Sequence, residues 1–241
     1  MDKLNIVKLS DVDSTNNYAL SLRESTAFKE GLIIVSDYQK KGKGQRENYW
    51  ESEKGTNLLI SVVIEPCISI EKQFDLSKIA AFSVMDFLYV LGIESKIKWP
   101  NDILVGNKKI AGILIQNVLC KNIITHSVIG IGLNVNQFVF EVYMPKATSL
   151  KLEMKKNFVL EEIQNELLSS MQNRIQAYRS GKESEMEYLN ALFQKDKVAV
   201  FESKSQKFNG IIRGITDRGL IIIETENSIK KFDLKEIKML F

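Results

Sequence analysis

The sequence predicts an α+β fold, in which a mixed sheet with flanking helices is followed by a small C-terminal β-barrel. Apolar runs typical of strands are interspersed with long segments of helical periodicity over residues 1–194. After this point the pattern changes to short β runs separated by turn residues, which suits a barrel that closes its own edges. We therefore expect a larger domain over residues 1–194 and a smaller one over residues 195–241.

Composition limits the class of protein. The chain has 241 residues, of which 44% are hydrophobic, enough to bury a substantial core. No apolar run reaches the roughly 18 residues that span a bilayer, and the first residues lack the layout of a signal peptide. We therefore expect a cytoplasmic protein with no membrane contact. The net charge of +3 is too small to indicate nucleic-acid binding by itself.

Few side chains are available for thiol or histidine chemistry. Cys67 and Cys120 show no paired spacing, and we expect both to be free, buried thiols in a reducing compartment. The single histidine, His126, lies in a strand-like run where a structural role is expected. One histidine without a Cys/His cluster argues against histidine-based triads and the usual zinc sites.

The first part of the chain predicts strands around one capped helix. The side chains of Asp13, Ser14 and Thr15 offer N-cap oxygens before a segment of helical periodicity. Small polar residues at such a position either cap the helix or bind polar ligand atoms, and Asn16 fits the same two interpretations. Apolar runs predict strands at residues 5–9, 32–35 and 58–64.

A loop too long for a tight hairpin, SDYQKKGKGQRENYW at residues 36–50, lies between the second and third of these strands. Loops of this length inside a compact domain are usually functional or disordered. Gly42 and Gly44 let successive backbone N–H groups turn toward one point, and the neighbouring cations add positive charge there. This pattern favours phosphate binding, although a merely solvated loop has the same composition.

A core helix and a polar strand end follow this loop. Apolar residues at positions 76–91 form one broad face, which predicts the helix. The next strand should end at Pro100, because proline lacks the N–H that central pairing requires. Asn101 and Asp102 then project from the strand end, either as turn formers or as site residues.

The remaining elements complete the two predicted domains. A hairpin is expected at residues 103–118, where Lys109 follows the turn and Gly112 interrupts an apolar run, a mark of a bulge or of close approach by a ligand. Two more helices are predicted, at residues 158–178 and 183–193. The barrel strands are predicted at residues 198–201, 208–215, 220–224 and 229–232.

A strand with glycines on one face, VIGIGLNV at residues 128–135, is the most unusual of the predicted elements. Alternation places Gly130, Gly132 and Asn134 on one face and apolar residues on the other. The glycine face leaves a slot for something flat and thin. Neither a mononucleotide glycine fingerprint nor a Walker loop fits, because the required helix and spacing are missing.

The order of these motifs resembles that of biotin protein ligases. The resemblance rests on Ser14-Thr15-Asn16, on Gln39 with GKGQRENYW, on KWPND at 98–102, on KIAGIL at 109–114 and on GIGLNVN at 130–136. It extends over nearly the whole chain, and the closing barrel is similar to the SH3-like barrel of that family. The catalytic pattern starts close to Met1, so we expect the form without an N-terminal DNA-binding domain, with no DNA as a partner.

The resemblance implies an ATP-dependent reaction in two steps. Biotin and ATP would form biotinyl-5'-adenylate with release of pyrophosphate. The biotinyl group would then pass to one lysine of a biotin carboxyl carrier protein or domain, such as that of acetyl-CoA carboxylase. Mg²⁺ is expected to accompany the nucleotide, with its protein ligands unknown, and a homodimer is compatible with the family.

Specific residues receive roles from the same resemblance. A carboxylate attacking a phosphate needs cations aimed at the transition state, so Lys109, Lys43 and Arg46 are expected catalytic residues for the first step. Asp102 is the expected catalytic residue for the second step, where it would accept the proton of the acceptor lysine or steer its approach. The expected biotin-binding residues are Ser14, Thr15, Asn16, Gln39, Gly42, Lys43, Gly44, Gln45, Lys109, Gly112, Gly130 and Gly132. The expected nucleotide-binding residues are Lys43, Arg46, Trp50, Asn101, Lys109 and Asn134, with the indole of Trp50 closing over adenine. No site residue is expected from the barrel.

The basic loop departs from the common pattern of the family. Lys43 and Gln45 stand where arginines are usual, and Glu47 stands where a glycine is usual. Lysine supplies a point charge in place of a two-pronged fork, and glutamine supplies no charge. We therefore expect retention of the adenylate to depend more on Lys43 than on Gln45.

Two other functions fit parts of the pattern. A lipoate or octanoate ligase would share the scaffold, although Trp50 and the KWPND and KIAGIL motifs favour biotin. A small RNA-binding protein would use the basic loop and the barrel, and would require aromatic rings exposed on the barrel surface. The candidate rings, at Phe201, Phe208 and Phe232, are equally suited to burial.

Overall fold

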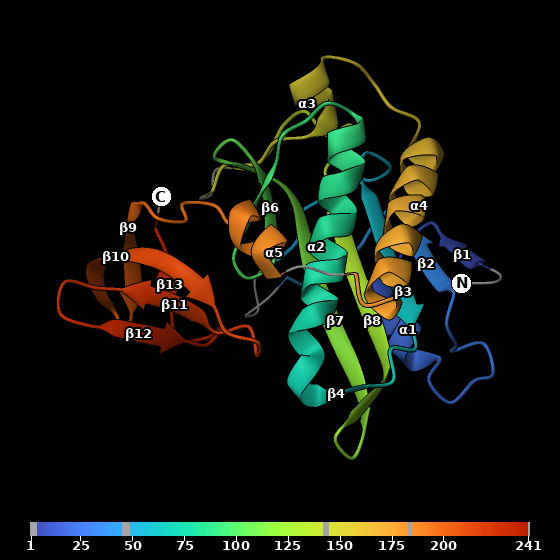
Figure 1. Ribbon diagram of the computed structural model, residues 1–241. Helices are drawn as coiled ribbons and strands as arrows, with labels where there is room; N and C mark the ends of the chain where they lie inside the picture. The colour runs from blue at the N-terminus through green and yellow to red at the C-terminus, as the bar shows by residue number, and fades with distance from the viewer. Residues whose placement is uncertain (1–3, 45–48, 142–144, 183–184, 241) are drawn as a thin grey trace.

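The computed structural model describes residues 4–44, 49–141, 145–182 and 185–240, and contains two sheets (Figure 1). The strands of the larger sheet are β1 (Asn5–Leu9), β2 (Leu32–Ser36), β3 (Leu58–Ile64), β4 (Ile68–Ser69), β5 (Lys96–Lys98), β6 (Asp102–Val105), β7 (Lys108–Cys120) and β8 (Ile123–Leu133). The helices are α1 (Thr15–Ser21), η2 (Ile70–Lys72), α2 (Gln73–Val90), α3 (Leu150–Met154), α4 (Leu160–Arg179) and α5 (Glu185–Ala191). The strands of the smaller sheet are β9 (Val198–Ser203), β10 (Gln206–Ile215), β11 (Ile221–Glu224), β12 (Ile229–Phe232) and β13 (Lys238–Met239).

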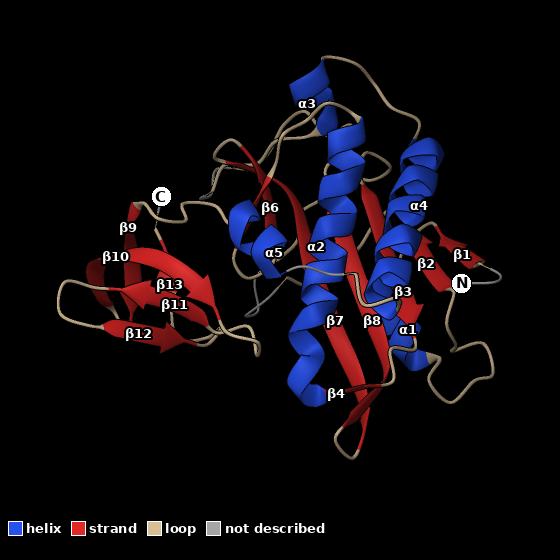
Figure 2. Cartoon of the chain, viewed as in Figure 1, coloured by secondary structure: helices blue, strands red, loops and turns tan. Residues whose placement is uncertain are grey.

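The larger sheet is mixed. Its strand order is β1-β2-β3-β8-β7-β6-β5, and β4 adds a short pairing to β8. Strands β1 and β2 run parallel, whereas the other strand pairs described in this sheet are antiparallel. Helices α2 and α4 lie side by side across one face (Figure 2). Helix α1 contacts β2, β3 and β8.

Alternation along β3 and β8 divides the buried residues between the two faces of the sheet. Ile60, Val62 and Ile129 belong to the large core that includes the residues of α2 and α4. Val63 and Val128 belong to a smaller cluster that includes Ala19 of α1. On this second face Gly130 lies against Asn16 of α1, whereas Gly112 and Gly132 lie against Trp50.

Local sequence signals explain where the helices begin and end. The hydroxyl of Ser14 accepts a hydrogen bond from the backbone N–H of Asn17, so it caps α1 as predicted. Helix α2 is followed by Gly92, whose φ of 76° lies in the left-handed region that suits glycine. Gly181, with a φ of 70°, follows α4 in the same way.

The smaller sheet shares the large hydrophobic core, since its Phe201, Ile212 and Ile223 belong to the same cluster as the residues of α2. The turn before β11 also contacts the larger part. The strand order of the smaller sheet is β12-β11-β10-β9-β13. The indole N–H of Trp99 donates to the carbonyl of Gly219 at 3.0 Å, and a Cβ at Gly219 would lie 2.7 Å from Cγ of Phe74. The predicted α+β fold with a small C-terminal barrel is confirmed. The division into folding units at residue 194 stays a prediction.

Two predictions about single residues have different outcomes. Cys67 and Cys120 are free, but both are exposed, so the prediction of burial is wrong. Cys67 lies in the turn after β3, and Cys120 ends β7 where the β7–β8 hairpin extends past its neighbours (Figure 1). The ring of His126 packs 5.0 Å from that of Phe28, a contact that suits a structural role. No helix in the described part of the chain is long and apolar enough to cross a membrane.

Candidate functional site

A cavity of about 810 Å³ lies between the glycine face of β7 and β8, the basic loop and the smaller sheet. Its lining brings together residues that are far apart in the sequence. The predicted site residues that line it are Ser14, Thr15, Asn16, Gln39, Lys43, Gly44, Trp50, Asn101, Asp102, Lys109, Gly112, Gly130 and Gly132. Most of the predicted site therefore forms one continuous surface.

Four predicted residues lie elsewhere or outside the described residues. Gly42 and Asn134 are absent from the described lining. Gly42 is buried beneath the loop, where its carbonyl accepts from the backbone N–H of Trp50 at 2.9 Å. The Asn134 amide donates to the carbonyl of Thr148 at 2.9 Å, which fixes the loop beside Lys109. Gln45 and Arg46 lie outside the described residues.

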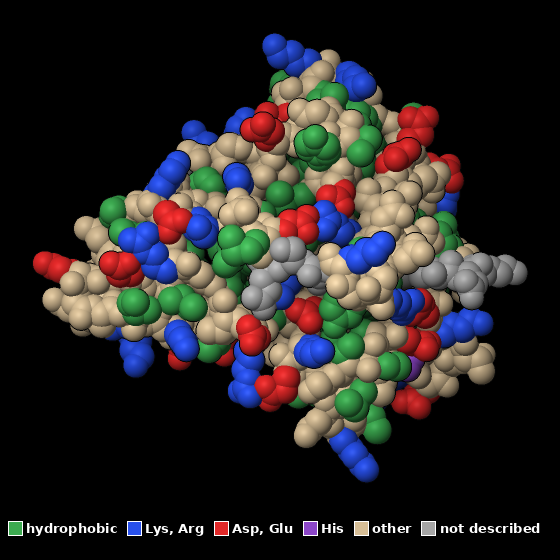
Figure 3. Space-filling view, viewed as in Figure 1, with side chains coloured by type: hydrophobic (Ala, Val, Ile, Leu, Met, Phe, Trp, Pro, Cys, Tyr) green, Lys and Arg blue, Asp and Glu red, His purple; other side chains and the backbone are tan. Residues whose placement is uncertain are grey.

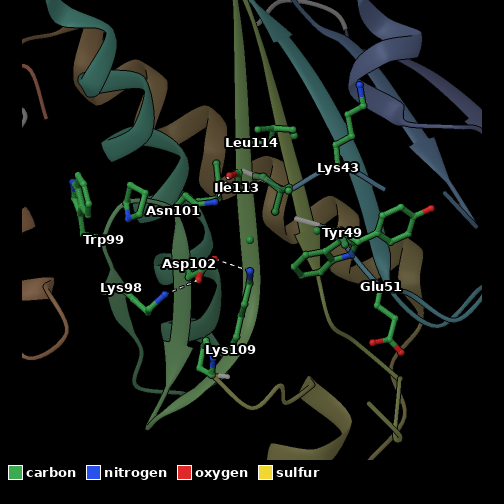
Figure 4. Close-up of a pocket in the computed structure, with 18 of the residues that line it drawn as sticks. Lys43, Tyr49, Glu51, Lys98, Trp99, Asn101, Asp102, Lys109, Ile113 and Leu114 are labelled. Atoms are coloured by element: carbon green, nitrogen blue, oxygen red, sulfur yellow. Dashed lines mark hydrogen bonds and ion pairs between the residues drawn. The ribbon is translucent and has the colours of Figure 1, made fainter. Parts of the chain in front are cut away.

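At one end of the cavity, the Asp102 carboxylate lies between two ammonium groups (Figure 4). Lys109 Nζ lies 2.7 Å from Oδ1, and Lys98 Nζ lies 3.3 Å from Oδ2. Pairing of β5 with β6 places Lys98 directly opposite Asp102, and β7 carries Lys109 on the neighbouring strand. The sheet register therefore assembles this charged cluster from three strands.

The charge state of this cluster follows from two opposing effects. Asp102 is 8% exposed, and burial on its own raises the pKa of a carboxyl group. The attraction of Lys109 and Lys98 outweighs burial and holds the pKa of Asp102 below its ordinary value. Asp102 is therefore ionised at neutral pH, and the cluster carries two positive charges for one negative charge.

The opposite end of the cavity is neutral and rich in hydrogen bonds. The Gln39 side-chain oxygen accepts from the backbone N–H of Thr15 at 2.8 Å and lies 3.1 Å from the hydroxyl oxygen of Thr15. The Asn16 amide nitrogen donates to the carbonyl of Leu114 at 3.0 Å and to the side-chain oxygen of Gln116 at 2.9 Å. These bonds join the N-terminus of α1, the basic loop and β7 around one polar corner.

The predicted slot over the glycines is occupied by flat groups of the chain itself. A Cβ at Gly132 would lie 2.7 Å from Cζ2 of Trp50, and one at Gly112 would lie 2.9 Å from Cζ3 of the same ring. A Cβ at Gly130 would lie 3.0 Å from Cγ of Asn16. Larger residues at these glycines would therefore displace Trp50 or Asn16.

The indole of Trp50 also contacts the charged cluster. Lys109 Nζ lies 5.3 Å from the centroid of the Trp50 ring, a distance at which a cation is attracted to the ring face. The indole N–H is buried and has no hydrogen-bond partner among the described atoms. A buried donor without an acceptor is costly, so this position of the ring is one that a ligand could displace.

Sequence analysis missed several residues that line the cavity. The described lining also includes Phe201, Ile221, Ile237, Lys238 and Met239 of the barrel, from which no site residue is expected, and that expectation stays a prediction. Lys98 was also missed, although it opens the KWPND motif and pairs with Asp102 across a hairpin. The side chain of Lys43 extends away from the cluster around Asp102 (Figure 4).

The aromatic rings of the barrel argue against the RNA-binding interpretation. The rings of Phe201 and Phe208 stack with centroids 5.9 Å apart, and those of Phe208 and Phe232 at 6.0 Å. Phe201 is only 1% exposed. On the face shown in Figure 3, basic and acidic side chains are interspersed, so it presents no continuous basic surface of the kind that RNA binding requires.

The described residues hold no group of three or more His, Cys, Asp or Glu side chains placed to bind a metal ion. Mg²⁺ in nucleotide sites is commonly held by one or two carboxylates together with the substrate phosphates. The cavity lining contains Asp102, Glu51 and Glu141 as carboxylates. The expectation of Mg²⁺ therefore stays a prediction.

This combination of a mixed sheet, a small C-terminal sheet, a glycine-floored slot and a buried carboxylate paired with two lysines defines a site for activating a carboxylic acid. A family model described as the biotin/lipoate A/B protein ligase family matches residues 9–134. A second, described as the biotin protein ligase C-terminal domain, matches residues 200–234. The first match covers more than half of the chain, which therefore belongs to the biotin/lipoate A/B protein ligase family.

Individual relatives share most of this chain. The bifunctional ligase/repressor BirA of Bacillus subtilis is 29% identical over 95% of this chain and 72% of its own length. The biotin--[acetyl-CoA-carboxylase] ligase of Mycobacterium tuberculosis is 28% identical over 90% of this chain and 82% of its own length. The structure of the biotin protein ligase from Aquifex aeolicus in complex with biotin and ATP is similar with a TM-score of 0.80, at 26% identity and over 98% of both chains.

Proposed function

We propose that this chain is an ATP-dependent biotin protein ligase that forms biotinyl-5'-adenylate and transfers biotin to a lysine of a carrier domain such as that of acetyl-CoA carboxylase. The observation that carries the proposal is the cavity of about 810 Å³. Along this cavity a neutral polar corner is followed by a glycine floor and then by the Lys109–Asp102 pair. Such a cavity can hold a ring, an aliphatic chain and an activated carboxyl group in that order.

In the first step, an oxygen of the biotin carboxylate attacks the α-phosphorus of ATP, a new P–O bond forms, and pyrophosphate leaves. Both reactants are anionic, so the site must supply positive charge where negative charge concentrates in the transition state. Lys109 would serve this purpose by leaving Asp102 for the phosphate oxygens. Lys98, 3.3 Å from the same carboxylate, would keep Asp102 paired when Lys109 moves.

In the second step, the neutral amine of the acceptor lysine attacks the carbonyl carbon of the adenylate, the amide bond forms, and AMP leaves. A free lysine with a pKa of about 10.4 is almost entirely protonated at neutral pH. Asp102 would orient this ammonium group and accept its proton, although its lowered pKa makes it a weak base. Departure of Lys109 from Asp102 would strengthen the base, because the nearest positive charge is then removed.

Relatives of this chain support the choice of biotin over lipoate or octanoate. The Mycobacterium tuberculosis relative is a biotin--[acetyl-CoA-carboxylase] ligase by name, and the Aquifex aeolicus structure is that of a biotin protein ligase in complex with biotin and ATP. The decisive measurement is pyrophosphate release from ATP with biotin, lipoate or octanoate as the acid. We expect release with biotin only, followed by biotin attachment when a biotin carboxyl carrier domain is added. Release with lipoate or octanoate but not with biotin would reject the proposal.

Finer aspects of the proposed function stay predictions. They include the identity of the acceptor, the absence of a DNA partner, a homodimer and a cytoplasmic location. Strand β1 forms an open edge of the larger sheet as described, and this edge is where a second copy could pair. Sedimentation of the purified chain with and without biotin and ATP would test the homodimer.

A further inference from the structure

Ser61 lies behind the polar corner, at a position that sequence analysis passed over. It is the fourth residue of β3, whose other members are all apolar, and its exposure is 0%. Its hydroxyl lies 2.7 Å from the hydroxyl oxygen of Thr15 and 2.6 Å from the side-chain oxygen of Asn16. A hydroxyl in the centre of a buried strand is costly unless its hydrogen bonds are made, so these contacts require an explanation.

The register of the sheet creates the space for this network. Ser61 pairs with Gly130 of the neighbouring strand β8. Because residue 130 has no side chain, the amide of Asn16 lies against its backbone, within reach of the Ser61 hydroxyl. Ser61 itself is absent from the described lining of the cavity, so it contacts the residues of the site and not the space within it.

Counting donors fixes the orientation of Asn16. Its amide nitrogen donates both hydrogens, to the carbonyl of Leu114 and to the side-chain oxygen of Gln116. The Asn16 oxygen is then an acceptor that needs a donor, and the single proton of Ser61 supplies it at 2.6 Å. With the Asn16 amide turned over, nitrogen would face the Ser61 hydroxyl and oxygen would face two acceptors.

The same count of donors determines where the hydroxyl proton of Thr15 points. The proton of Ser61 is given to Asn16, so the contact of 2.7 Å between the two hydroxyls is satisfied when Thr15 donates to Ser61. The oxygen of Gln39 still accepts from the backbone N–H of Thr15 at 2.8 Å. Within the described residues, the amide nitrogen of Gln39 makes no hydrogen bond that would compete with a ligand.

This ordering gives the polar corner a fixed polarity before any ligand arrives. Asn16 presents an oxygen with one remaining lone pair, which accepts a hydrogen bond. Gln39 presents amide hydrogens, which donate. A cyclic urea or amide carries an N–H donor beside a carbonyl acceptor, so its edge is complementary to these two groups.

We propose that Ser61 is a positioning residue for the ring of the substrate, acting through Asn16 and Thr15. Its proton fixes the orientation of the Asn16 amide at the cavity wall and so favours a ring with an N–H group beside a carbonyl. This inference rests on the proposed function, because biotin carries such a cyclic urea. Replacement of Ser61 leaves both lysines and the carboxylate of the charged cluster in place.

The test compares the variants Ser61→Ala and Ser83→Ala in adenylate formation, which is measured as pyrophosphate release. Ser83 is a matched control, since it is also 0% exposed but lies in α2 and donates to the carbonyl of Ile79. We expect Ser61→Ala to raise the KM for biotin about tenfold, the effect of one hydrogen bond, while the KM for ATP and kcat change less than about twofold. Ser83→Ala should leave the KM for biotin unchanged.

A double-mutant cycle separates positioning from general destabilisation. If Ser61 acts through Asn16, Ser61→Ala in an Asn16→Ala background has little further effect on the KM for biotin, so the two effects are not additive. Ser61→Thr keeps the hydroxyl and should recover part of the lost affinity. Additive effects, or equal effects of Ser61→Ala and Ser83→Ala, would overturn the inference. If the wild-type enzyme is active, those outcomes reject the role of Ser61 and leave the proposed function intact.

Discussion

The two ends of the cavity solve different physical problems. The polar corner around Thr15, Asn16 and Gln39 is neutral, and its hydrogen bonds are made within the protein. The charged cluster pairs Asp102 with Lys98 and Lys109, so its charges are compensated by one another. The polar corner can bind a ligand while keeping its hydrogen bonds within the protein. In the charged cluster, by contrast, a lysine must leave Asp102 to pair with an incoming anion.

This difference predicts that substitutions at the two ends change different kinetic constants. Removing a neutral group that contacts the ring weakens binding of one substrate and raises its KM. Removing a cation that acts on the transferring phosphate removes stabilisation realised mainly in the transition state, so kcat falls. The following experiments test the comparison, from the largest expected effect to the smallest.

Replacement of Lys109 should have the largest effect. Lys109→Ala removes the cation nearest the reacting phosphate, and we expect kcat for pyrophosphate release to fall about 100- to 1000-fold with a small change in the KM for biotin. Lys108→Ala is the matched control, because the neighbouring Lys108 is exposed and pairs with Glu153 at 2.7 Å. A higher KM for biotin with an unchanged kcat would show that the two ends of the cavity do not have distinct roles.

Replacement of Asp102 should act on the transfer step. Asp102→Asn keeps the shape of the side chain but removes the negative charge between the two lysines. We expect biotin transfer from preformed adenylate to a carrier domain to slow about 100-fold, the lower end of the range typical of general-base catalysis. A single-turnover assay measures this rate, and an unchanged rate would exclude Asp102 from the second step.

Acid should destabilise the protein through the same carboxylate. The pKa of Asp102 is lowered in the folded protein by its lysine partners, so its contribution to stability is complete above the unfolded value of about 3.9. That contribution is lost as the pH falls through the lower, folded pKa. Thermal melts of the wild type and Asp102→Asn at pH 2 to 6 should therefore converge as the pH falls, whereas a constant difference would contradict this origin.

The smallest effect is a change in fluorescence. The indole of Trp50 lies on the glycine floor, so a ligand that fills the slot should displace it and shift its emission. Trp99, whose indole N–H is bonded to Gly219, should stay where it is. Titration with biotin should therefore shift the emission of the wild type but not of Trp50→Phe. A shift that persists in Trp50→Phe would contradict displacement of this ring.

Many residues of the site could be predicted from the sequence because they lie in short motifs with local causes. The cap at Ser14, the alternation around Gly130 and Gly132, and the end of β5 before Pro100 each follow from neighbouring residues. Predictions failed where exposure depends on distant packing, as for Cys67 and Cys120. The part of the cavity lining that the barrel supplies, including Lys238 and Met239, was not predicted either, because it depends on how the smaller sheet docks.

The sequence by itself determined the order of the longer helices and strands, the glycine face and most of the candidate residues that line the cavity. These features depend on periodicity, capping and backbone conformation, which act over a few residues. Only the tertiary structure decided that Ser61 reaches Asn16, that Lys98 joins Asp102 and that Trp50 covers the glycines. Such contacts depend on which strands pair and in which register, and this is set by burial over the whole sheet.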